Sequence, residues 1–299
     1  MIINILYNDN GVGLTRDANL LRVILTQAGH EVAILDQLRH QRSRMADVCI
    51  HLEHVHYRMF HMGQRHVFFP NPEWYQAGWD KFLDRMAVVC AKTLDCQNIF
   101  QKKHFQTIYT GFTSEDRYTP GTHKRRAYLH VGGQSETKCT REVHDAFYRN
   151  GFGKLVITSK KYNFKTTDKI FFSNWLSQDD IRDLQNTCSI HVCPSQYEGF
   201  GHYINEARSC GAVIITTDWP PMHEFARNGN GFLVPISATR RMGIATIANI
   251  TSEGLAQVIR VVESTGDAKL KQMGEASRQA YLDDDKAFKE RFLHIIKHL

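Results

Sequence analysis

Residues 194–207 read PSQYEGFGHYINEA, the most informative segment of the chain. Residues 190–193 before it, which are apolar except for His191, predict a buried strand, and the segment that starts at His202 predicts a helix. Gly199 and Gly201 lie between the two and allow a ligand to approach the backbone closely. Because the free amides at a helix N-terminus bind phosphate well, the stretch predicts a strand–loop–helix junction that holds a phosphate group.

Two carboxylates accompany this glycine loop. Glu198 lies within the loop, and Glu206 lies inside the expected helix. A carboxylate accepts hydrogen bonds from vicinal hydroxyls, as a sugar or a ribose presents them. A single glutamate on a helix is usually solvated, but the pair predicts a ligand with a sugar on one side of a phosphate and a ribose on the other.

Strands and helices alternate along the rest of the chain in two sections. The first section predicts a helix at 15–28 and strands at 2–7, 31–35, 48–52, 66–69, 87–90 and 106–109. After a polar stretch at 113–126, the second section predicts strands at 127–131, 155–158, 170–172, 190–193 and 213–216, helices at 140–149, 178–187 and 202–209, and mostly helix over 252–299. Such alternation is typical of parallel sheets covered on both faces.

We therefore expect an α/β protein made of two Rossmann-like, doubly wound domains that face a central cleft. The first and shorter domain spans 1–118, and the second spans 119–280. The last segment, 281–299, is expected to form a helix that either packs back on the first domain or lies on the surface. A ligand would bind at the carboxyl ends of the strands.

Glu198, Glu206 and the seven residues between them, with Gly-Phe-Gly and the following Ala207, resemble the EX7E signature of retaining nucleotide-sugar glycosyltransferases. The sequence is most similar to glycosyltransferase family 4, the glycosyl transferases group 1, over about residues 127–235. The resemblance implies the GT-B fold. It also implies that Glu198 contacts hydroxyls of the donor sugar, that Glu206 binds the nucleotide ribose and that the amides of 199–201 face the diphosphate.

The resemblance assigns further residues, and it shows one departure. The family places an arginine and a lysine on the loop after the first strand of the second domain, where this chain has Gln134 and, one position early, Lys138. Lys138 would still stabilise the leaving diphosphate as a point charge, with Lys160, Lys161 or Arg16 as compensating cations. The implied donor-binding set is Gly11, Gly13, Gln134, Ser135, Asn174, Trp175, Leu176, Tyr197, Gly199, Phe200, Gly201 and Glu206.

Histidines follow one strand of the first domain. The resemblance implies that His51 or His54 lines the active site and, with Glu198 and Lys138, completes the catalytic set. Metal binding by these histidines is disfavoured, because no carboxylate or cysteine completes a ligand set. We interpret the acidic run at 283–285, which superficially resembles the DxD metal motif of another glycosyltransferase fold, as acids at the start of a helix. We expect no metal and no cofactor.

The composition, the first residues and the cysteines indicate the class of protein and its compartment. The chain has 299 residues, 42% hydrophobic and 23% charged, and no apolar run of the length that spans a bilayer. The start MIINILYNDNGVG does not resemble a signal peptide, and the seven scattered cysteines suit reduced thiols. We therefore expect a cytoplasmic protein, with contact to the inner membrane surface as an option.

A basic stretch at 39–66 holds five arginines and six histidines against Asp47 and Glu53. It is either a solvated face or a site for an anionic or large acceptor. The expected function is transfer of a sugar from a nucleotide-diphosphate sugar to a glycan, lipid-linked or polymeric acceptor, with retention. The alternatives are a glycosyltransferase that acts on modified bases of nucleic acid and a non-catalytic protein that binds sugar nucleotides.

Overall fold

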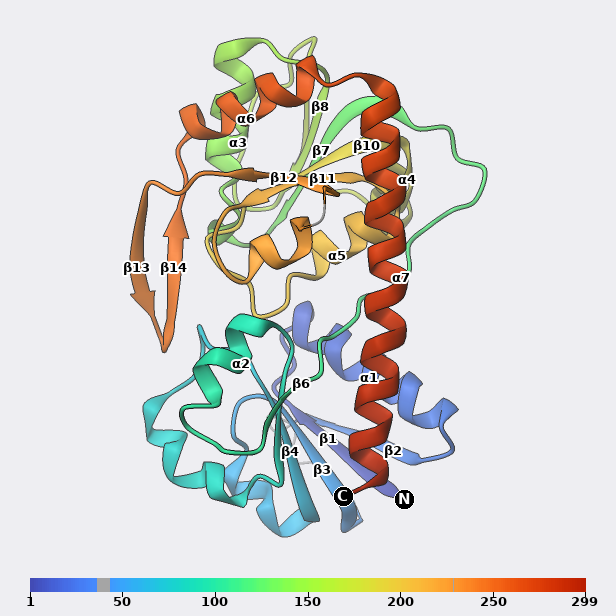
Figure 1. Cartoon of the computed structure of the whole chain (residues 1–299), viewed down its shortest axis with the longest axis vertical. Helices are drawn as coiled ribbons and strands as arrows, with labels where there is room; N and C mark the ends of the chain where they lie inside the picture. Colours follow the sequence, from blue (N-terminus) through green and yellow to red (C-terminus); the bar gives the residue numbers. More distant parts are fainter. Residues whose placement is uncertain (37–43, 228) are drawn as a thin grey trace. The chain divides into compact units, whose positions relative to one another are not determined.

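A computed structural model describes residues 1–36, 44–227 and 229–299, and the chain divides into two compact units (Figure 1). The first unit comprises 1–114, 241–245 and 284–299. The second comprises 115–240 and 246–283. The first division therefore falls after Ser114, four residues before the predicted boundary at 118.

The first unit is built on a parallel sheet of six strands in the order β2-β1-β3-β4-β5-β6. Its strands are β1 (Ile2–Tyr7), β2 (Glu31–Asp36), β3 (Ala46–Glu53), β4 (Gly63–Pro70), β5 (Val88–Ala91) and β6 (Thr107–Tyr109). The helix α1 (Gly13–Gln27) connects β1 to β2, and α2 (Leu94–Phe100) connects β5 to β6. Leu14, Ala18, Leu21 and Leu25 follow helical spacing and are buried, so α1 covers the sheet with its apolar face.

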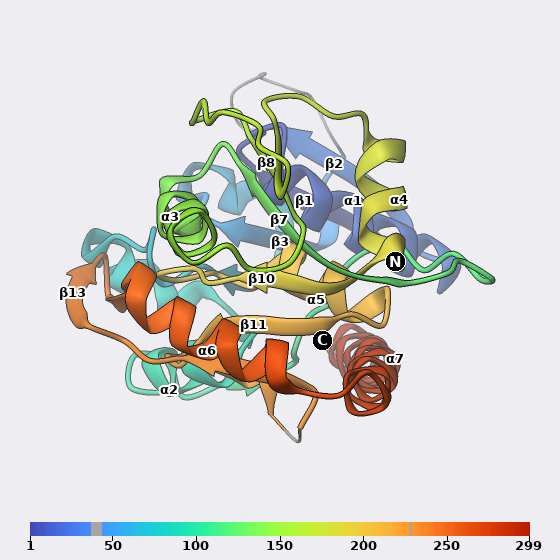
Figure 2. The ribbon, with the colours of Figure 1, turned by 90° about the horizontal axis from the view of Figure 1, so that it is seen from above.

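The second unit repeats this plan. Its parallel sheet has six strands in the order β12-β11-β10-β7-β8-β9. The strands are β7 (Arg125–Gly133), β8 (Leu155–Ser159), β9 (Ile170–Ser173), β10 (Cys188–Cys193), β11 (Val213–Thr217) and β12 (Gly231–Val234). The helices are α3 (Thr140–Asn150), α4 (Gln178–Thr187), α5 (His202–Ser209) and α6 (Ser252–Ser264), and α6 packs against α3 and β12 (Figure 2). The two sheets confirm the predicted α/β, doubly wound fold class.

The last helix, α7, runs from Asp267 to Lys297. Its final part belongs to the first unit, where Phe288 and Phe292 are fully buried beside Phe112 and Phe69. The acidic run 283–285 lies in the middle of α7, so its interpretation as the start of a helix is wrong. Asp285 instead accepts a hydrogen bond from Thr113 at 2.7 Å.

Two features were not predicted. A two-stranded sheet of β13 (Ala238–Met242) and β14 (Ala245–Asn249) follows β12, and its residues 241–245 belong to the first unit. The helix α2 was also missed, because it has only seven residues. Among the described residues, no helix is both long and apolar enough to cross a membrane.

Candidate functional site

The predicted site residues of the second unit lie on loops at one edge of its sheet. Strands β7 and β10 are parallel neighbours, so the loops that follow them, 134–139 and 194–201, start at the same edge. The backbone amide of Gln196 donates to the carbonyl of Thr137 at 2.8 Å and joins the two loops. The structure therefore brings Lys138 and Glu198, which are far apart in the sequence, to a common place.

Gly201 ends the second of these loops and precedes α5. Its φ of +89° lies in the left-handed region, which disfavours residues with a side chain. A Cβ at this position would lie 3.3 Å from Ile204 Cδ1 and 3.4 Å from Cβ and Cγ of Glu198. Glycine thus sets both the turn into α5 and the room for the Glu198 side chain.

A chain of contacts connects Glu198 to Lys138. Ser195 donates its hydroxyl proton to Glu198 Oε1 at 2.6 Å, and therefore accepts the hydrogen bond from the hydroxyl of Tyr203. Lys138 Nζ lies 4.0 Å from the centroid of the Tyr203 ring, a cation–π contact. Burial raises the pKa of Tyr203 well above its usual value, so the hydroxyl stays a donor. The other oxygen of Glu198, Oε2, has no partner in the part of the chain that the structure describes.

Lys138 is positioned by tight backbone packing below it. A Cβ on Gly132 would lie 2.5 Å from Thr140 Oγ1, so only glycine fits there. The buried His130 bridges this region, with Nδ1 donating to the Val192 carbonyl at 2.7 Å and Nε2 accepting from Thr140 at 2.9 Å. Burial lowers the pKa of His130 to about 4, which keeps the ring neutral. Lys138 Nζ also lies 3.4 Å from the carbonyl of Val131.

Gln134 and Ser135 lie on the same loop. Gln134 is exposed, and the hydroxyl of Ser135 bonds to that of Thr137 at 2.7 Å. Lys161, predicted as a compensating cation, pairs with Glu136 at 2.9 Å. Lys160 is exposed and has no ion pair among the described residues. Of these three lysines, Lys138 is the one whose ammonium group is held by Tyr203 and by the Val131 carbonyl.

Glu206, which is predicted to bind the nucleotide ribose, is almost fully buried. It is 4% exposed, accepts a hydrogen bond from Gln185 Nε2 at 3.1 Å and lies 4.0 Å from Arg117 Nη1. Arg117 Nε and Gln185 Oε1 are buried, and neither has a hydrogen-bond partner among the residues that the structure describes. Sequence reasoning missed both residues, because neither lies near the recognised signature. Unpaired buried polar atoms are rare, and here they surround a predicted ligand contact.

The remaining predicted donor contacts of this unit differ in how exposed their side chains are. Asn174 and Trp175 are exposed and Leu176 is half-buried on the loop after β9, which lies two places from β7 in the sheet. Tyr197 and Phe200 are buried at 5% and 6% exposure, and Phe200 packs against Phe225. Their place among the donor-binding residues stays a prediction, and burial leaves their backbone groups as the parts that could reach a donor.

In the first unit, the predicted glycine loop precedes α1. Gly11 has a φ of +65°, and Gly13 has open space where a Cβ would be. Asp9 Oδ1 accepts from the Gly11 amide, and Asn10 Oδ1 accepts from the amides of Val12 and Leu14. The side chains of Asp9 and Asn10 thus hold the loop in shape.

The two candidate histidines differ in accessibility. His51 is fully buried, its Nδ1 accepts from the His56 amide at 3.1 Å and its Nε2 lies 3.0 Å from His66 Nδ1. Both ring nitrogens are thus used, and burial lowers its pKa well below the usual value. The side chain of His54 is 26% exposed, and its Nδ1 lies 3.0 Å from Asn8 Nδ2. Of the two, His54 presents its ring to the surface, and the prediction that one of them lines the active site stays a prediction.

A polar cluster beside His54 was not predicted. Glu53, the last residue of β3, has a φ of +62°, which is unusual for a residue with a side chain and is common at functional sites. Its carboxylate accepts from Asn71 at 2.7 Å. Asn71 in turn accepts from Lys92, which forms a buried ion pair with Asp17 at 2.5 Å. No motif in the sequence connects these residues.

The basic stretch carries less charge than its composition suggests. Arg39, His40 and Arg42 lie outside the described residues. His51, His56 and His66 are buried, and burial lowers the pKa of each. Arg44 pairs with Glu31 at 3.7 Å. Because nucleic-acid binding depends on positive charge, a nucleic-acid acceptor is less favoured by this stretch than its composition suggests. In the described part of the chain, no group of three or more His, Cys, Asp or Glu residues is arranged to hold a metal ion.

Comparisons with known proteins match part of the second unit to glycosyltransferases. Residues 150–279 match the family model described as glycosyl transferases group 1. The GDP-mannose:cellobiosyl-diphosphopolyprenol alpha-mannosyltransferase of Xanthomonas oryzae pv. oryzae (strain PXO99A) is 29% identical over 140 residues, which are 41% of this chain. The matched part spans 36% of that relative's length.

Solved structures match the whole chain at low sequence identity. A glycosyltransferase from Rickettsia africae ESF-5 has a TM-score of 0.75 and 12% identity, with 99% of this chain and 98% of that one covered. The sucrose-phosphate synthase of Thermosynechococcus elongatus has a TM-score of 0.77 and 11% identity, with 100% and 98% covered. The comparisons thus give a match of residues 150–279 to the glycosyl transferases group 1 model, within a chain that has the GT-B fold.

Proposed function

We propose that the chain is a glycosyltransferase that moves a hexose from a nucleotide-diphosphate sugar to a glycan or lipid-linked glycan acceptor. The observation that carries the proposal is the contact chain Lys138–Tyr203–Ser195–Glu198 at the carboxyl edge of the second sheet. It joins a cation for a leaving diphosphate to a carboxylate with a free oxygen for a sugar hydroxyl. The family match of residues 150–279 supports the same reaction class.

The chemistry follows from these groups. As the bond between C1 of the sugar and the diphosphate oxygen breaks, negative charge grows on the leaving group. Lys138 and the amides at the start of α5 stabilise that charge, and such electrostatic stabilisation is a large term in catalysis. Glu198 orients the sugar through its hydroxyls, and Glu206 binds the ribose. Retention is part of the proposal by family resemblance, and the departing diphosphate takes the acceptor proton.

The donor and the acceptor are proposed by class. The Xanthomonas relative is named for GDP-mannose and for a cellobiosyl-diphosphopolyprenol acceptor. We therefore propose GDP-mannose as the first donor to test, with UDP-hexoses next, and a lipid-linked glycan as the first acceptor. No metal enters the proposal. The cleft expected between the domains stays a prediction.

A binding screen tests the proposal. Thermal unfolding is followed with GDP-mannose, UDP-glucose, UDP-galactose and the free nucleoside diphosphates, for the wild type and for Glu206→Gln. The expected result is a rise in Tm with one donor and its diphosphate that is lost in Glu206→Gln. The variant keeps the hydrogen-bonding shape beside Gln185, and its own Tm without ligand reports whether it folds. No rise with any of these nucleotides would contradict the proposal.

A further inference from the structure

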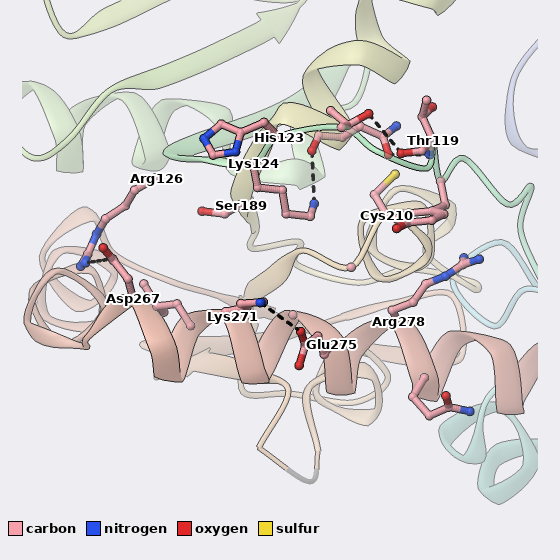
Figure 3. A pocket seen from close by; sticks show the side chains of 17 residues that line it. Thr119, His123, Lys124, Arg126, Ser189, Cys210, Asp267, Lys271, Glu275 and Arg278 are labelled. Carbon is pink, nitrogen blue, oxygen red and sulfur yellow. Dashed lines mark hydrogen bonds and ion pairs between the residues drawn. The ribbon is translucent and has the colours of Figure 1, made fainter.

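A cavity lies in the second unit, away from the loops described above (Figure 3). Its volume is about 710 Å³, within the range of small-molecule sites. It is lined by residues just before or at the starts of β7, β10 and β11, and by the first half of α7. Because these strands are parallel, their amino ends lie at the edge opposite to the loops that carry Lys138 and Glu198.

The lining of this cavity is basic. It contains four permanent cations and two carboxylates, namely Lys124, Arg126, Lys271, Arg278, Asp267 and Glu275. Arg126 pairs with Asp267 at 2.6 Å, Arg278 pairs with Asp116 at 2.7 Å, and Lys271 pairs with Glu275 at 3.9 Å, which leaves Lys124 as the unpaired charge among the described residues of the lining. Figure 3 shows Lys124 and Lys271 on opposite sides of the space. The excess of positive charge favours an anionic ligand.

Lys124 is the cation without a counter-ion. Its ammonium group donates to the backbone carbonyl of Asn186 at 3.3 Å and has no carboxylate within ion-pair distance among the described residues. The side chain is half-buried, and burial lowers its pKa. A charge that is withdrawn from water is costly unless it is paired, so this ammonium group is suited to receive an anion.

The wall that holds Lys124 is fixed in place. Asn186 Oδ1 accepts from the Thr119 amide at 2.8 Å, and Asn186 Nδ2 donates to the Arg117 carbonyl at 2.8 Å. Both ends of the Asn186 side chain are thus used, which sets the position of the carbonyl that Lys124 contacts. Thr119, Thr122 and Ser189 add hydroxyl groups to the same lining.

We propose that this cavity binds a small phosphate monoester, with Lys124 as the main contact of the phosphate. A phosphate group carries close to two negative charges and three acceptor oxygens, which match a cluster of ammonium and hydroxyl donors. The volume leaves room for an organic part about the size of a sugar. The inference is independent of the proposed transferase activity, because none of the residues at the carboxyl edge takes part.

Isothermal titration at low ionic strength tests the proposal, with glucose 6-phosphate as the probe and glucose as the uncharged comparison. The expected result is binding of glucose 6-phosphate and none of glucose. Lys124→Gln should weaken the binding at least tenfold, because a hydrogen bond to a charged group is lost. Lys271→Gln, at an exposed position that leaves the fold intact, should weaken it a few-fold. Lys138→Gln, on the opposite edge, should leave it unchanged.

Two results would overturn the proposal. One is an absence of binding to the folded wild type. The other is binding that survives in both Lys124→Gln and Lys271→Gln but disappears in Lys138→Gln, because the phosphate would then occupy the candidate donor site. Thermal unfolding of each variant without ligand identifies any that fails to fold, and Lys271→Gln then carries the comparison.

Discussion

Lys138 Nζ lies 4.0 Å from the centroid of the Tyr203 ring, and the hydroxyl of that ring is hydrogen-bonded to Ser195, which donates to Glu198. One aromatic side chain on α5 thus connects the cation of one loop to the carboxylate of another. Because the ring holds Lys138 by its face and Ser195 by its hydroxyl, the two contacts can be removed separately.

The pair Tyr203→Phe and Tyr203→Leu separates these roles. Phenylalanine keeps the ring below Lys138 and removes only the bond to Ser195, so we expect kcat to fall less than about tenfold, the effect of one neutral hydrogen bond. Leucine removes the cation–π contact as well, and we expect a fall of more than about 100-fold from a displaced Lys138. Steady-state kinetics with the identified donor measures both. Equal losses in the two variants would show that the ring does not position Lys138.

Gln134→Arg adds the arginine that the family has at this position. Gln134 is exposed, so the substitution has room and should not change the free energy of unfolding. A guanidinium binds a diphosphate through two hydrogen bonds, and we expect the nucleoside diphosphate to bind about tenfold more tightly. Titration calorimetry with the diphosphate measures this. Unchanged or weaker binding would mean that the loop after β7 does not face the diphosphate.

Gly201→Ala tests the turn that makes room for Glu198. A left-handed alanine costs about 1–2 kcal/mol of stability, and its Cβ would press on Glu198 Cβ and Cγ at 3.4 Å. Gly121→Ala is the matched control, because Gly121 has a φ of +77° but nothing within 4 Å of a Cβ. Denaturant unfolding should show similar losses of stability in both. Only Gly201→Ala should lose activity, and equal activities would exclude this role for the turn.

Stability is expected to fall in acid because of buried neutral histidines. Burial lowers the pKa of His130 to about 4 and that of His191 to about 3. Between these values and the ordinary pKa of about 6.5, the unfolded chain binds protons that the folded chain does not. The free energy of unfolding therefore falls as the pH falls through this window, by up to about 1.4 kcal/mol per pH unit for each histidine.

Urea unfolding between pH 7 and pH 4.5 measures this slope. His130→Gln removes one titrating group and should give a smaller slope than the wild type, although it is less stable at neutral pH. His294→Gln, at an exposed position, should keep the wild-type slope. A slope in His130→Gln equal to that of the wild type would show that His130 is not a neutral, buried group in the folded protein.

The sequence predicted the sheets because parallel strands leave a simple pattern. Strand β10 is a short apolar run between a helix and a glycine loop, and its burial is complete or nearly so from Ile190 to Cys193. The same pattern located every strand of the first sheet to within three residues at each end. Strand β13 escaped prediction, since Arg240 and Arg241 interrupt the apolar alternation that marks a strand. Strand β14, which pairs with it, was missed as well.

The candidate site was predicted only where its residues share a local signature. Glu198, Gly201 and Glu206 lie on one strand–loop–helix segment, so spacing alone finds them. Arg117 lies in a polar connecting stretch, yet the fold brings it within 4.0 Å of Glu206. Such a pairing depends on tertiary packing that no local pattern encodes. The exposure of a side chain also depends on tertiary packing. It distinguishes His54 from His51 only once the partners of each ring are known.

Measuring donor turnover distinguishes a glycosyltransferase from a protein that only binds sugar nucleotides. The purified chain is incubated with the donor found by the binding screen, with and without a lipid-linked glycan acceptor, and the released nucleoside diphosphate is measured over time. We expect release by the wild type that increases with acceptor. Release should fall about 100-fold or more in Lys138→Gln and in Glu198→Gln, and should be unchanged in Lys165→Gln. Binding of the donor without any release of diphosphate, by the wild type and all three variants alike, would contradict this expectation and show a protein that only binds sugar nucleotides.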